Sequence, residues 1–120
     1  MTVRVSQINV CPFCVDLNSA TLLQRGVSID KVKALEGWRE SVLFDEREKT
    51  ILEYTEAMTR SDLRVDDELV ERLRAFLADD AIVELTGLIA FQNMSSKFNS
   101  ALGVPAQGFC KLPGVAAQGK

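Results

Sequence analysis

Two cysteines separated by two residues carry the densest chemistry in the chain. Cys11 and Cys14 enclose Pro12 and Phe13, and the residues that follow are apolar or small at helical spacing. This pattern places Cys11 at the N-terminus of a helix and Cys14 one turn into it, where unpaired backbone amides stabilise a thiolate. Two neighbouring thiols of this kind can close to a disulfide and reopen. The spacing therefore predicts dithiol redox chemistry at Cys11 and Cys14.

The absence of histidine limits the other chemistries. The 120 residues contain no histidine and three cysteines, which excludes Ser-His-Asp and Cys-His nucleophiles and zinc sites with imidazole ligands. A zinc site would need a carboxylate as its fourth ligand. We therefore predict no metal and no bound cofactor. The third cysteine, Cys110, lies in a tail rich in glycine and proline and is interpreted as an incidental thiol.

Charge and hydropathy exclude several partners. The net charge is −3 and the isoelectric point is about 5.0, so the basic face that nucleic acid requires is missing. No apolar run approaches the length of a membrane span, and the N-terminal residues lack the apolar core of a signal peptide. We expect a cytoplasmic protein without nucleic-acid or membrane partners. With 47% hydrophobic residues, the chain can form one domain over residues 1–120.

Capping residues and hydrophobic periodicity predict a succession of helices. Ser28, Asp45 and Asp66 are placed as N-caps, and Asp79 or Asp80 opens the last helix. Residues 2–10 alternate loosely and fit either a short strand or the last turns of a helix. The further helices expected are 12–24, a short one after Ser28 that ends at Gly37, one after Asp45 that includes Met58, 67–78, and 81 to about 99, with a loop or tail over 103–120.

A strand followed by Cys-Pro-Phe-Cys and a helix is also how a glutaredoxin or thioredoxin begins. That fold needs further strands and a proline-containing turn facing the thiols. Residues 28–100 contain successive helix signals and no proline. The sequence therefore favours an all-α bundle of about five to six helices.

The apolar and aromatic side chains are assigned to packing. The first half of the last helix is apolar nearly all round, which predicts burial on several sides or a covering subunit. Trp38, Phe44 and Phe91 are interpreted as core or subunit-contact residues, and acids such as Glu36 as solvated or capping charges.

Several motifs together resemble the carboxymuconolactone decarboxylase superfamily in its alkylhydroperoxidase D-like branch. They are Arg-Val-Ser-Gln-Ile-Asn at 4–9, Cys11-x-x-Cys14 followed by Val-Asp-Leu, Gly-Trp-Arg-Glu at 37–40 and Phe-Asp-Glu-Arg-Glu at 44–48. The similarity covers roughly residues 4–100. The paired thiols favour the redox branch over the lactone decarboxylase activity that gives the superfamily its name.

The resemblance implies a helical trimer or hexamer whose dithiol reduces peroxides or exchanges with disulfides, with a thiol protein as reductant. It also implies that Cys14 attacks the peroxide and Cys11 resolves the sulfenic acid. Position at the helix start instead favours Cys11 as the thiol of lower pKa. Both assignments remain open at this point.

The sequence departs from the family pattern at two proton-transfer groups. Asn18, one turn after Cys14, stands where the family has histidine, and an amide cannot take a proton. The family also has a glutamate further upstream than the ten residues that precede Cys11 here, so we expect that carboxylate to be missing. Glu53, Tyr54 and Glu56 are the groups that could approach from another helix.

From these features we predict a thiol–disulfide oxidoreductase or weak alkylhydroperoxidase with an incomplete proton relay. Its candidate catalytic residues are Cys11, Cys14 and Asn18. The alternative is a member of the superfamily that has no catalytic activity and acts as an oligomeric binding module.

Overall fold

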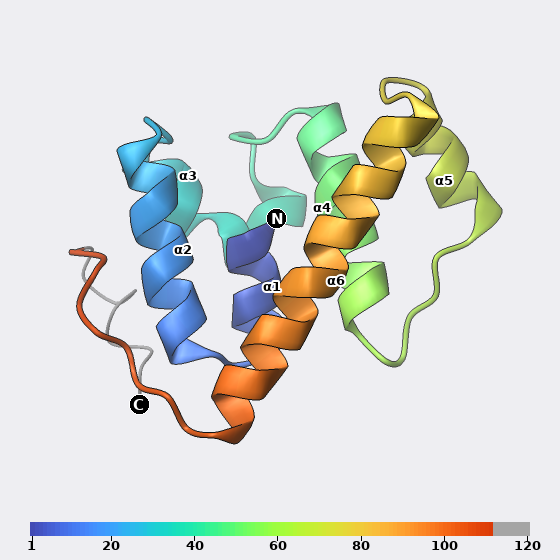
Figure 1. Cartoon of the computed structure of the whole chain (residues 1–120). Coiled ribbons are helices and arrows are strands. Elements are labelled where there is room, and N and C mark those ends of the chain that lie inside the picture. The colour runs from blue at the N-terminus through green and yellow to red at the C-terminus, as the bar shows by residue number, and fades with distance from the viewer. Residues whose placement is uncertain (112–120) are drawn as a thin grey trace.

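A computed structural model describes residues 1–111, and every regular element in that range is helical. This confirms the expected all-α class. α6 runs diagonally across the molecule, with α1 and α2 beside one half and α4 and α5 beside the other (Figure 1). The bounds are α1 Thr2–Ile8, α2 Pro12–Gln24, α3 Ile29–Lys33, the 3₁₀ helix η1 Leu35–Glu40, α4 Glu46–Thr59, α5 Asp67–Arg74 and α6 Asp79–Ala101.

The ambiguous N-terminal stretch is a helix. α1 contacts α2, α4 and α6 and buries Val3, Val5 and Ser6. Because three helices enclose it, buried residues occur on more than one of its faces, and this hides the 3.6-residue period. α1 is therefore the central element of the bundle, and the turn that follows it leads into the dithiol.

The turn between α1 and α2 sets the start of α2. Val10 adopts a left-handed conformation with φ of 51°, and the backbone N–H of Cys11 donates to the carbonyl of Ser6 at 3.0 Å. Pro12 then occupies the first helical position, where its missing N–H costs nothing. α2 ends at Gln24 as predicted, and Gly26 with φ of 89° terminates it.

The predicted N-caps Ser28 and Asp45 begin helices as expected. The Ser28 side chain accepts the N–H of Lys31, and Asp45 and Glu48 form a reciprocal capping box at α4. The predicted end at Gly37 is wrong, since α3 ends at Lys33 and Gly37 lies inside η1. The chain tightens there to a 3₁₀ helix, which turns Leu35 and Trp38 into the core.

The predicted helix over 67–78 is also too long. Asp66 caps α5 as expected, but the helix ends at Arg74. The chain leaves the helical path there, and Phe76 and Leu77 pack against the core cluster around Leu73. α6 then begins at Asp79 without a side-chain cap and continues to Ala101, beyond the predicted end.

One face of α6 lies in the bundle and the opposite face is uncovered in this chain. Ile89, Gln92 and Ser96 are buried. The sequence predicted that this helix is apolar nearly all round. In the structure, one of its faces is in the core and its other apolar face is exposed. The members of this exposed α6 face are Val83, Leu88, Phe91, Met94, Phe98 and Leu102.

Residues 103–111 form an irregular segment, as predicted for the tail. This segment turns back along α2 after the end of α6 (Figure 1). The rest of the predicted tail, 112–120, lies outside the described residues.

Candidate functional site

The predicted dithiol forms at the start of α2. Cys11 is the N-cap residue of the helix and Cys14 lies in its first turn. Their Cα atoms are 5.3 Å apart and their sulfur atoms are joined in a disulfide. A separation of three residues across a helix start brings the two side chains to the same side, which is the geometry that thiol–disulfide interconversion requires.

Each sulfur of the pair accepts from one uncharged N–H donor. The backbone N–H of Cys14 donates to Cys11 Sγ at 3.2 Å, and the side-chain amide of Asn99 donates to Cys14 Sγ at 3.6 Å. A hydrogen bond to the charged form of a group favours that form. When the disulfide is reduced, both thiolates therefore have a donor in place.

Access to the sulfurs is restricted in the single chain. Cys11 is fully buried and Cys14 is 3% exposed. Cys11 nevertheless lines a pocket of about 350 Å³ together with Gln7, Val10, Pro12 and Glu36. This pocket lies next to Cys11, but Cys11 itself has no exposed surface in the single chain. Glu36, which the sequence suggested as a solvated charge, borders this pocket.

Asn18 is hydrogen-bonded to a buried hydroxyl and not to the dithiol. Its amide donates to Ser6 Oγ at 3.2 Å, and Gln92 of α6 donates to the same oxygen at 3.3 Å. Ser6 in turn donates to the carbonyl of Thr2 at 2.7 Å. Asn18 therefore joins α2 to α1 through an uncharged polar cluster beside the dithiol.

The amide group that does reach the dithiol is Asn99 of α6. It is 85 residues from Cys14 in the chain, so no local spacing could have identified it. Its neighbours Ser96, Lys97 and Ser100 are also polar, so its residue type did not distinguish it.

The acidic residues considered as helpers are engaged elsewhere. Glu56 accepts from Trp38 Nε1 at 2.8 Å and from Arg4 Nε at 2.9 Å, and it pairs with Arg39. Burial alone would raise the pKa of Glu56, but these donors outweigh it and lower the pKa. Glu56 is thus an ionised structural anchor of α1, α4 and η1.

The other two candidates also have partners away from the sulfurs. Glu53 pairs with Arg72 of α5 at 2.7 Å. The hydroxyl of Tyr54 lies 2.6 Å from that of Thr86. Neither has a hydrogen bond to Cys11 or Cys14 within the described chain, so both serve to join neighbouring helices.

Asp16 anchors the tail to α2. Its buried carboxylate accepts the backbone N–H groups of Gln107, Phe109 and Cys110 at 2.8, 3.0 and 2.6 Å. Burial would raise the pKa of Asp16, yet these backbone donors prevail and lower it. Cys110 is a buried free thiol that packs with Ala20, and its interpretation as an incidental thiol stays a prediction.

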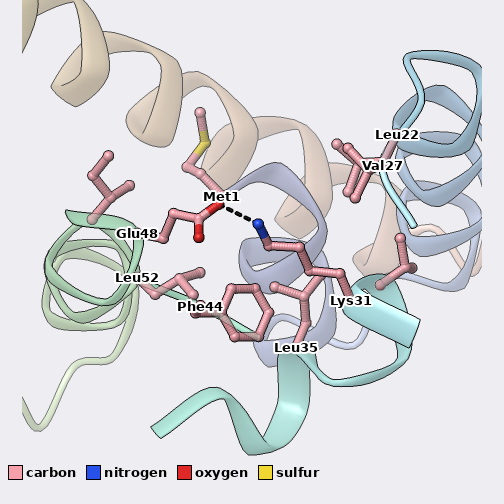
Figure 2. Close-up of a pocket in the computed structure, with 10 residues that line it drawn as sticks. Met1, Leu22, Val27, Lys31, Leu35, Phe44, Glu48 and Leu52 are labelled. Carbon is pink, nitrogen blue, oxygen red and sulfur yellow. Dashed lines mark hydrogen bonds and ion pairs between the residues drawn. The ribbon is translucent and has the colours of Figure 1, made fainter. Parts of the chain in front are cut away.

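A second pocket lies away from the dithiol. It has a volume of about 260 Å³ and is lined mostly by apolar side chains, including Leu22, Phe44 and Leu52. Figure 2 shows the ion pair of Lys31 and Glu48 beside Phe44 at this pocket. Lys31 and Glu48 neutralise each other there, and the N-terminal residue Met1 also lines the pocket.

Two further features are absent from residues 1–111. No group of three or more histidine, cysteine, aspartate or glutamate side chains is placed to hold a metal ion there. No helix in that range has the length and apolar character needed to cross a membrane.

Comparison with known proteins gives consistent matches. A profile of the carboxymuconolactone decarboxylase family matches residues 1–57, which include the dithiol. The uncharacterized protein YnjA of Escherichia coli is 44% identical over 113 residues, which are 94% of this chain and 62% of YnjA. The uncharacterized protein YdfG of Bacillus subtilis is 31% identical over 102 residues, 84% of this chain and 69% of YdfG. The chain thus spans 62% of the length of YnjA.

A solved structure shares the fold. The crystal structure of ATU0492 from Agrobacterium tumefaciens superimposes with a TM-score of 0.84 at 29% identity, covering 88% of this chain and 73% of that one. ATU0492 is described as a protein of unknown function and a candidate antioxidant defence protein AhpD. The match confirms the AhpD-like helical fold expected from the sequence.

Proposed function

Because the chain belongs to the carboxymuconolactone decarboxylase family and has the AhpD-like fold, we propose that it is a thiol–disulfide oxidoreductase or weak alkylhydroperoxidase. Cys11 and Cys14 carry the reaction without a bound cofactor. The substrate is a peroxide or a disulfide, and a thiol protein supplies the electrons. The protein acts in the cytoplasm.

The observation that supports this proposal most directly is the disulfide at the N-terminus of α2. The two sulfurs need no rearrangement of the helix to join, and each has an N–H donor for its thiolate form. A helix start lowers the pKa of a thiol placed there. The site therefore favours a dithiol that cycles over a pair of inert cysteines.

The peroxidase cycle follows from two nucleophilic attacks. The Cys14 thiolate attacks one peroxide oxygen, the O–O bond breaks, and the alcohol leaves with a proton from solvent. The Cys11 thiolate then attacks the sulfur of the Cys14 sulfenic acid and displaces hydroxide, which is protonated to water. The sum converts one peroxide and two thiols into an alcohol, water and a disulfide.

Regeneration proceeds by exchange with an external dithiol. One reductant thiolate attacks Cys11, which lines the pocket, and the S–S bond breaks with its electron pair leaving on Cys14. The second reductant thiol then attacks the mixed disulfide and frees Cys11. This direction of attack places the reductant on the side of the pocket that Cys11 lines.

The proton relay limits the peroxidase rate. General acid–base assistance contributes about 10² to 10⁴ in rate, and Asn18 cannot supply it. Thiol exchange needs only a thiolate and is less affected. We therefore expect exchange activity to exceed peroxide turnover.

The exposed α6 face supports a homo-oligomer, a trimer or hexamer. Phe91 and Phe98 are 61% and 64% exposed in the single chain, and contiguous exposed apolar side chains of this size favour contact with another protein surface. A second copy of the chain would cover them.

The same face favours a second candidate function, an oligomeric binding module without catalysis. The burial of both sulfurs is the observation that supports it, since a thiol that no reactant can reach is inert. The two functions differ in whether the disulfide responds to a redox buffer in the native state.

A redox titration of the native protein separates the two. For the oxidoreductase, the Cys11–Cys14 disulfide forms and opens at a defined potential, and Cys14→Ser abolishes turnover. For the module, the dithiol resists both oxidation and reduction until the protein unfolds. Thiol counting by mass after alkylation reports the state, and circular dichroism shows that the fold persists.

A further inference from the structure

We propose that Asn99 is a further catalytic residue, which binds Cys14 Sγ through its side-chain amide and stabilises the Cys14 thiolate. This inference rests on the proposed redox function of the dithiol. Through Asn99, the last helix α6 would take a direct part in the chemistry of the Cys11–Cys14 pair.

The position of Asn99 is fixed on both sides along α6. One turn before it, Ser96 Oγ accepts from Asn9 Nδ2 at 2.9 Å. Directly after it, Ser100 Oγ donates to the carbonyl of Val10 at 3.0 Å. Both partners belong to the turn that leads from α1 into the dithiol. The end of α6 is thus joined to this turn, and the amide of Asn99 faces Cys14 at 3.6 Å.

The hydrogen bond acts on the charged form of the sulfur. A disulfide sulfur is a poor acceptor, whereas a thiolate is a full negative charge, so an N–H donor at this distance favours the thiolate over the thiol. Cys14 N–H already serves Cys11. Asn99 therefore supplies an N–H donor to Cys14 Sγ, as the first turn of α2 supplies one to Cys11 Sγ.

The charged groups around Cys14 are directed elsewhere. Asp16 on the same helix accepts the backbone N–H groups of the tail, and Arg4 of α1 is paired with Glu56. Lys97 of α6 is exposed, and Glu36 of η1 borders the pocket beside Cys11. Among residues 1–111, no charged side chain has a hydrogen bond or ion pair with either sulfur. Removing the neutral amide of Asn99 should therefore lower the fraction of Cys14 that is present as thiolate.

The same bond assists both halves of the cycle. In the attack on peroxide it increases the fraction of Cys14 present as thiolate. In reduction, the S–S bond breaks with its electron pair leaving on Cys14, and a leaving thiolate of lower pKa departs faster. Loss of Asn99 should slow both steps.

The test isolates Cys14 as the single thiol in a Cys11→Ser, Cys110→Ala background. The ultraviolet absorbance of the thiolate is followed against pH, which needs no reagent to reach the buried sulfur. Asn99→Leu removes the donor at similar volume, and Asn99→Asp replaces it with a negative charge. We expect the thiolate fraction at neutral pH to fall about threefold to tenfold for leucine and further for aspartate. Asn99→Ala supplies the same comparison if leucine does not fold.

Asn93→Ala is the matched control. Asn93 is an amide on the same helix that bonds Thr59 and Asn9 and neither sulfur, so its loss should lower stability and leave the Cys14 titration unchanged. Equal titrations for the parent and both Asn99 variants, or an equal shift for Asn93→Ala, would overturn the proposal. The titration needs no turnover, so it remains valid if the full dithiol fails to reduce peroxide or disulfide, which would count against the proposed function alone.

Discussion

Asp16 Oδ1 lies 2.6 Å from the backbone nitrogen of Cys110, 94 residues further along the chain. The carboxylate also accepts two other tail amides, so one buried charge two residues after Cys14 holds the segment that returns along α2. The packing of Phe109 edge-on against Phe13, with ring centroids 6.1 Å apart, places this segment beside the cysteine motif.

Asp16→Asn should destabilise the fold by about 2–4 kcal/mol at neutral pH, because an amide offers one acceptor where the carboxylate offers two and places an N–H₂ against a donor. The lowered pKa of Asp16 adds a pH signature. Its stabilisation is complete above the usual value of 3.8 and is lost as the pH falls through the lowered pKa. Urea unfolding of both proteins across this range should show the difference shrinking in acid. A constant difference at all pH values would contradict this role.

Glu56→Gln should cost about 1–3 kcal/mol, since it removes the charge that holds Arg4 and Trp38. The lowered pKa of Glu56 means that this stabilisation, too, is present above the usual 4.5 and fades below it. Glu53→Gln is the matched control, because its pair with Arg72 is partly exposed and is worth about 0.5 kcal/mol or less. In thermal unfolding, Glu56→Gln should lower the midpoint temperature clearly more than Glu53→Gln does.

Asn18→His places an imidazole one turn after Cys14. We expect peroxide turnover to rise about tenfold to a hundredfold with a pH midpoint near the ordinary histidine value of about 6.5. Stopped-flow measurement of disulfide formation after peroxide addition gives the rate. Disulfide exchange with a small dithiol should change little in the same variant. An unchanged peroxide rate would mean that proton transfer does not limit this dithiol.

Cys110→Ala should leave the redox potential of the dithiol unchanged, because Cys110 packs against Ala20 and Val32 and not against the cysteine pair. The lost sulfur should cost about 1 kcal/mol of stability through the small cavity it leaves. Titration in a glutathione buffer, followed by alkylation and mass measurement, checks the potential. A shifted midpoint would give Cys110 a part in the cycle.

Phe91→Glu should dissociate the expected homo-oligomer, because it places a charge in the centre of the exposed α6 face. Sedimentation gives the mass of the parent and the variant. Val42→Glu serves as control, since Val42 is also exposed but lies away from α6. A parent that sediments as a monomer would refute the oligomer.

Local sequence signals determined the elements that depend on few neighbours. The spacing of Cys11 and Cys14, Pro12 between them and Gly26 after the helix predicted α2 with its correct bounds, because caps and turn residues act within one helical turn. Asp45 and Asp66 predicted the starts of α4 and α5 for the same reason.

Tertiary packing decided the remainder. α1 could not be told from a strand because burial on several sides removes its period, and α5 ends early because Phe76 and Leu77 turn into the core. The bonds of Asn99 to Cys14 and of Asp16 to Cys110 join residues more than 80 positions apart. Residue types alone carry no information about such pairs, since the path of the intervening helices sets which side chains meet.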